Sequence, residues 1–127
     1  MRFVTPDVER IQLTNGDWIE VKKELTVGEE RRYRSAGMRN ITPNDGGQST
    51  IEIDWGMMAI ARAMAYLVDW SDKRPIAKDA DRRSAIESLA QEDFNEIDQA
   101  IETHIAKQVD AKNAKSGNEK QPPTLPS

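Results

Sequence analysis

The chain has 127 residues, a length that suits one domain and leaves no room for two independent cores. Its formal net charge of −4 argues against nucleic acid as the main partner, because phosphate binding needs a basic surface. The absence of cysteine excludes disulfides, thiolate metal ligands and cysteine nucleophiles, and it suits a reducing cytoplasm.

Hydrophobic residues make up 37 % of the chain. This fraction is lean beside a usual share of roughly 45–50 %. We expect a core this small to be stabilised by contacts in a homo-oligomer or with a partner protein. The first ten residues, MRFVTPDVER, contain no apolar segment of the kind found in a signal peptide, so none is expected.

The first predicted element is a β-hairpin over residues 9–23, where Asn15-Gly16 lies between two alternating apolar runs. A two-residue loop would scatter the apolar side chains over both faces. A three-residue loop over 14–16, with Gly16 in the left-handed conformation, gathers them on one face and is favoured. The gathered residues are Ile11, Leu13, Ile19 and Val21.

Thr26 and Glu29 match a capping box, which predicts a helix over residues 27–39. The turn residues of 41–48 predict a loop. Ile51 and Ile53 alternate with Glu52 and predict a short extended segment.

The most apolar stretch of the chain, WGMMAIARAMAYLVDW, predicts a central helix over 54–70 that is packed on most sides, with Asp54 as its N-cap. It is too short, and too interrupted by Arg62, to span a bilayer. Two more helices are predicted over 81–89 and 92–110. The polar, proline-rich residues 111–127 predict a disordered tail.

Together these elements predict a single domain over residues 1–110 that is mainly α, with about four helices and a small N-terminal β-hairpin (α+β).

No catalytic, metal or cofactor site can be assembled from these residues. His104 lies on the apolar stripe of the last helix and is interpreted as a packed histidine. The carboxylate pairs Asp93 with Glu96 and Asp69 with Asp72 are interpreted as solvated helix faces.

The segment RRYR, residues 31–34, is the strongest hint of nucleic-acid contact. Its acidic neighbours Glu29 and Glu30 weaken that hint, and an electrostatic match to the acidic C-terminal helix, within or between chains, is at least as plausible.

Methionines and tryptophans gather in and beside the central helix. Such side chains can fill a core, or they can form a surface that accepts varied apolar partners. The second alternative predicts a partner-binding set, Trp55, Met57, Met58, Met64 and Trp70.

Three segments are similar to a known family when taken together. They are DWIEVKKELTVGEERR at 17–32, MAYLVDWS at 64–71 and SAIESLAQEDFNEIDQAIETHI at 84–105. In this order and spacing, over residues 9–108, they resemble the tail assembly chaperones of long-tailed, non-contractile bacteriophages and related prophages.

The resemblance implies a protein without enzymatic activity that acts in the host cytoplasm. Such chaperones bind the long, apolar tape measure protein, keep it soluble, and help tail tube subunits polymerise around it. They are absent from the mature virion, and a frameshift often yields a longer form. Two alternatives remain: a tail or head–tail connector subunit retained in the virion, and a small nucleic-acid-binding regulatory protein that uses RRYR.

Overall fold

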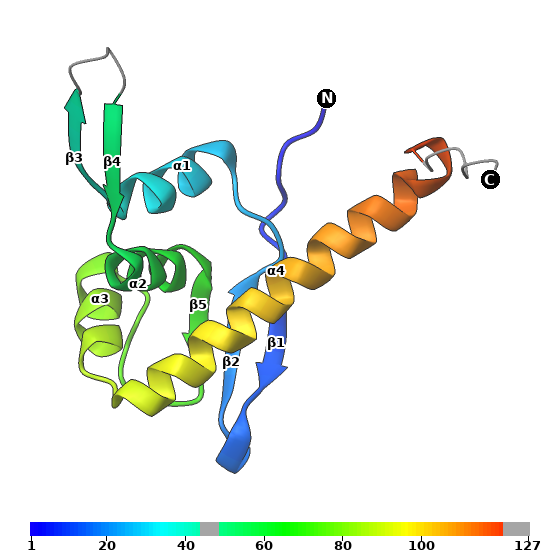
Figure 1. Cartoon of the computed structure of the whole chain (residues 1–127). Coiled ribbons are helices and arrows are strands. Elements are labelled where there is room, and N and C mark those ends of the chain that lie inside the picture. The colour runs from blue at the N-terminus through cyan, green and yellow to red at the C-terminus, as the bar shows by residue number, and fades with distance from the viewer. Residues whose placement is uncertain (44–48, 121–127) are drawn as a thin grey trace.

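A computed structural model describes residues 1–43 and 49–120. Within these ranges it has four α-helices and five β-strands (Figure 1), and it confirms a mainly helical α+β fold with an N-terminal hairpin. The strands are β1 (Val8–Gln12), β2 (Trp18–Lys22), β3 (Met38–Pro43), β4 (Ser49–Ile53) and β5 (Leu67–Trp70). The helices are α1 (Val27–Ala36), α2 (Trp55–Tyr66), α3 (Asp79–Glu87) and α4 (Gln91–Lys120).

The hairpin β1–β2 has the predicted register. Ile11 faces Ile19 across the strands, and the amide of Leu13 donates to the carbonyl of Asp17 at 2.8 Å. The loop depends on a positive φ of 78° at Gly16, a conformation that glycine adopts without steric cost. The apolar face therefore points into the protein, where Ile19 is buried.

The predicted helix over 54–70 is wrong in its last turn. Helix α2 ends at Tyr66, and β5 follows at once and pairs antiparallel with β2. This pairing completes a three-stranded sheet in the order β1-β2-β5. Leu, Val and Trp suit a strand as well as a helix, and the open side of β2 offers them main-chain hydrogen bonds.

A second hairpin, β3–β4, is the element that the sequence prediction missed. Helix α1 has the predicted Thr26–Glu29 capping box but ends at Ala36 instead of continuing to residue 39. Strand β3 then takes up residues 38–43, part of which was predicted as loop, while residues 44–48 lie outside the described ranges. The extended segment around Ile51 is confirmed as β4. Figure 1 shows this hairpin projecting from the body where α1 and α2 meet.

The last two helices begin near their predicted positions, but α4 is longer than predicted. It continues past Asp110 to Lys120, through residues assigned to a disordered tail. Residues 121–127 of that predicted tail lie outside the described ranges. Alanine and lysine favour helix, which allows α4 to continue beyond its last core contact.

The core lies between the three-stranded sheet and helices α2, α3 and α4. Helix α2 was expected to be packed on most sides, yet it buries only Ala61 and Ala63 fully. The cluster of buried core residues consists of Ile19, Val21, Ala63, Leu67, Trp70, Ile76, Ala85, Ile86, Ile97 and Ile101.

Candidate functional site

Exposed apolar side chains gather at the base of the β3–β4 hairpin. Ile51 and Ile53 lie two residues apart on β4 and therefore on the same face. Met38 of β3 is paired with Ile53 and shares that face. Trp55 and Met57, in the first turn of α2, come directly after this strand. We call these residues the hairpin-base patch; their exposed fractions are Met38 46 %, Ile51 49 %, Ile53 42 %, Trp55 71 % and Met57 38 %.

Local backbone contacts position the hairpin-base patch. The carboxylate of Asp54 accepts a hydrogen bond from the amide of Met57 at 2.9 Å, as an N-cap does, and so makes Trp55 the first helical residue. The Asp54 amide donates to the carbonyl of Gly37 at 2.8 Å. These bonds hold the end of α1, the start of α2 and the base of the hairpin together.

The five residues predicted to bind a partner do not form one surface. Trp55 and Met57 are exposed in the hairpin-base patch, whereas Met58 is half-buried beside Gly37. Met64 is half-buried and packs against the core.

Trp70 does not belong to an exposed surface. It lies in β5 opposite Ile19, is 7 % exposed, and its indole Nε1 donates to the carbonyl of Arg74 at 2.8 Å. The sequence prediction placed Trp70 at the end of a helix, and the strand turns it into the core instead. The Ile-Glu-Ile alternation was the available signal for the patch residues Ile51 and Ile53.

His104 is packed, as predicted, and ties α4 to the sheet. It is 1 % exposed, and its Nε2 donates to the carbonyl of Lys22 at 2.9 Å. Its Nδ1 lies 3.2 Å from Oε2 of Glu9. The ring also meets Tyr66 edge to face, with the centroids 6.1 Å apart. With both ring nitrogens occupied by these contacts, the geometry fits a structural histidine.

Three carboxylates of α4 bind other elements of the fold, so the predicted solvated face does not hold for Glu96. Glu96 accepts hydrogen bonds from the amide and the hydroxyl of Thr14, at 2.8 and 3.1 Å, and docks the hairpin turn onto α4. Asp98 and Glu102 accept from Arg62 of α2, at 2.7 and 2.8 Å. Among residues 1–43 and 49–120, no group of three or more His, Asp or Glu side chains could hold a metal ion.

Arg62 is the cation that meets the acidic helix. Burial acts to lower its pKa, but the hydrogen bonds and charges of Asp98 and Glu102 outweigh that effect and raise the pKa above its ordinary value. In the predicted RRYR segment, Arg34 pairs with Glu30 of its own helix at 2.8 Å. Arg31 and Arg32 are exposed.

No family model matches the chain, and no curated protein or solved structure matches it. No helix within the described residues is both long enough and apolar enough to span a membrane. The function is therefore inferred from the hairpin-base patch and from the resemblance of the sequence segments.

Proposed function

We propose that this protein is a phage tail assembly chaperone that binds apolar helical segments of the tape measure protein. It acts in the host cytoplasm, keeps that protein soluble, assists assembly of the tail tube protein around it, and leaves before the virion is complete. The proposal combines the segment resemblance over residues 9–108 with the exposed hairpin-base patch.

The observation that carries the proposal is the hairpin-base patch itself. Trp55 is 71 % exposed and follows β4 directly, and the other four exposed apolar residues come from β3, β4 and the first turn of α2. Covering a large apolar side chain is worth about 1.5–3 kcal/mol. Several large exposed apolar side chains in one region of a small protein are typical of a protein-binding site.

Co-expression with the tape measure protein of the same genome tests the proposal. We expect the tape measure protein to be insoluble alone, and to become soluble and co-purify in the presence of this chain. The double variant W55S/M57S should lose both effects, while the V27S variant should keep them. Val27 is a matched control because it is 76 % exposed and apolar but lies at the start of α1, outside the patch.

Two results would overturn the proposal. The first is a tape measure protein whose solubility is the same with and without this chain. The second is recovery of this chain from purified virions by mass spectrometry, which would support a tail or head–tail connector subunit instead.

A further inference from the structure

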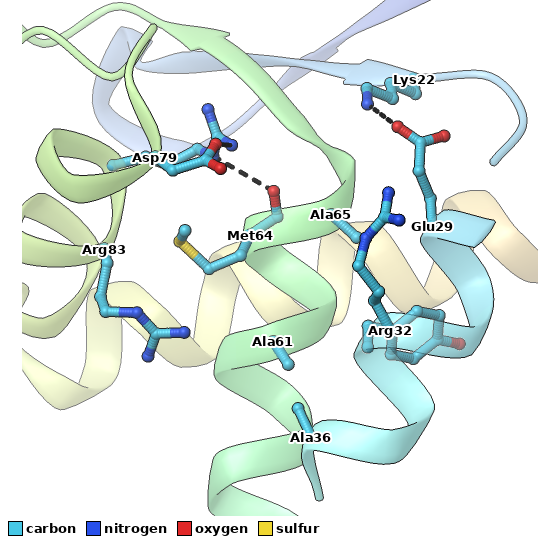
Figure 2. A pocket seen from close by; sticks show the side chains of 11 residues that line it. Lys22, Glu29, Arg32, Ala36, Ala61, Met64, Ala65, Asp79 and Arg83 are labelled. Carbon is cyan, nitrogen blue, oxygen red and sulfur yellow. Dashed lines mark hydrogen bonds and ion pairs between the residues drawn. The ribbon is translucent and has the colours of Figure 1, made fainter. Parts of the chain in front are cut away.

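A second surface feature is a hollow of about 340 Å³ over helix α2, between α1 and α3. Figure 2 shows that α2 provides its floor through Ala61, Met64 and Ala65. Ala36 of α1 lies beside them. The alanine side chains are short, so the hollow stays open between the longer charged side chains that also line it. We call this hollow the arginine groove, because of the two side chains described next.

Most of the charges that line the arginine groove cancel in pairs. Lys22 forms an ion pair with Glu29. Arg82 pairs with Asp79 at 2.5 Å and also donates to the carbonyl of Ile76 at 2.8 Å. These four side chains are engaged within the protein and contribute no net charge to the groove.

Two further arginines give the groove its positive charge. Arg32 has no hydrogen bond or ion pair to any residue in the described ranges. Arg83 has only a long contact of 3.6 Å with Glu87 on its own helix, and both side chains are about half exposed. Figure 2 shows Arg32 coming from α1 and Arg83 from α3, with Ala61 of α2 between them.

We propose that the arginine groove binds a carboxylate-bearing helix of the partner protein. Aspartate or glutamate side chains of that helix would pair with Arg32 and Arg83, whose planar guanidinium groups match carboxylates. Small apolar side chains of the same helix would lie on the alanine floor. The inference rests on the proposed function in one respect, that the natural source of this helix is the tape measure protein.

Charge complementarity favours this occupant. The chain as a whole carries a net charge of −4, whereas the groove is lined by four cationic and only two anionic side chains. A nucleic acid would instead bring a row of phosphates onto this acidic protein, which offers only Arg32 and the loosely paired Arg83 here.

Fluorescence anisotropy with a synthetic helical peptide tests the groove without the tape measure protein. The labelled probe is an alanine- and leucine-based amphipathic helix with two glutamates on one face, and a second probe has glutamine at both positions. We expect the R32Q/R83Q double variant to bind the glutamate peptide about tenfold more weakly than the wild-type chain, since two exposed ion pairs are lost. The glutamine peptide should bind weakly to both proteins.

The R31Q variant is the matched control, because Arg31 is an exposed arginine of the same helix that does not line the groove. Equal weakening by R31Q, equal binding of the two peptides, or stronger binding of a DNA duplex than of the peptide would each overturn the inference. If the glutamate peptide does not bind at the groove but the tape measure protein is still solubilised, only the assignment of the groove is contradicted. If the peptide binds at the groove but the tape measure protein is not solubilised, the proposed function is what fails.

Discussion

Gly37 lets α1 end directly against α2. A Cβ atom at this position would lie 2.8 Å from Cβ of Met58 and 3.3 Å from the carbonyl oxygen of Asp54. The Cβ of Met58 belongs to its helix and cannot move away as a flexible chain end can. A residue without a side chain is therefore required where the two helices and the β3–β4 hairpin meet.

The variant G37A should lower the free energy of unfolding by about 1–3 kcal/mol, because the helices must separate to admit the methyl group. The variant G28A is its control. A Cβ there would meet only Nη1 of Arg32 at 3.4 Å and Oγ1 of Thr26 at 4.0 Å, and alanine favours helix over glycine by up to about 1 kcal/mol. Urea unfolding should show opposite shifts, and shifts of the same sign would contradict the packing argument.

Because of Tyr66, the free energy of unfolding should depend on pH in the alkaline range. Its burial, aided by the nearby Tyr33 and Glu30, raises its pKa from 10.0 to about 12. Between these values the unfolded chain has lost a proton that the native protein retains, so stability falls as pH rises from about 10 to 12. Unfolding free energies across this range should fall less steeply for Y66F, and parallel profiles would contradict the assignment.

At the scale of elements, features encoded by neighbouring residues could be predicted from the sequence. The turn at Gly16 and the N-caps Thr26 and Asp54 depend on contacts within a few residues, and all three are present. The helix-to-strand change after Tyr66 could not be predicted, because the apolar run MAYLVDW fits either structure. The distant strand β2 decides it by pairing with Leu67 and Trp70.

The candidate site was only partly predictable for the same reason. The sequence offered Trp55 and Met57 either as core residues or as partner-binding residues, and the structure leaves both exposed. It could not bring in Met38, because that residue reaches Ile53 only through strand pairing.

Arg62 connects α2 to α4 and gives a test at this scale. The variant R62A leaves Asp98, whose side chain is 22 % exposed, without its cation, and should cost about 1–3 kcal/mol of unfolding free energy. The variant R34A is the matched control, since the Arg34–Glu30 pair is largely exposed and worth about 0.3–0.5 kcal/mol. If chemical denaturation gave equal losses of unfolding free energy for both variants, the contact between α2 and α4 would stabilise the fold no more than an exposed ion pair does.

On the scale of the whole molecule, the three-stranded sheet and the β3–β4 hairpin differ in the burial of their described apolar residues. Strand β2 lies between β1 and β5 and buries Ile19 and Val21, whereas β4 pairs only with β3 among the described strands and leaves Ile51 and Ile53 exposed. An isolated two-stranded hairpin is marginally stable in water. Apolar side chains of the body are therefore buried, whereas the hairpin residues Met38, Ile51 and Ile53 are exposed.

Hydrogen exchange should resolve this difference. We expect the amides of β2 to exchange more slowly than those of β4 by about tenfold or more, because β4 can open without unfolding the core. Addition of the tape measure protein should slow exchange in β4 and leave β2 unchanged. Equal protection of the two strands in the free protein would contradict the division into a stable body and a weakly held hairpin.

The strand edges also bear on aggregation. In the three-stranded sheet, β5 has only four residues and a broken register with β2, and β1 carries the charges of Glu9 and Arg10, all of which discourage another chain from adding. Strand β4, with the sequence STIEI, has a single charged residue, Glu52. Self-association into intermolecular β-sheet is therefore expected to begin at β4 when the protein is concentrated, and any ligand that covers this strand should suppress it.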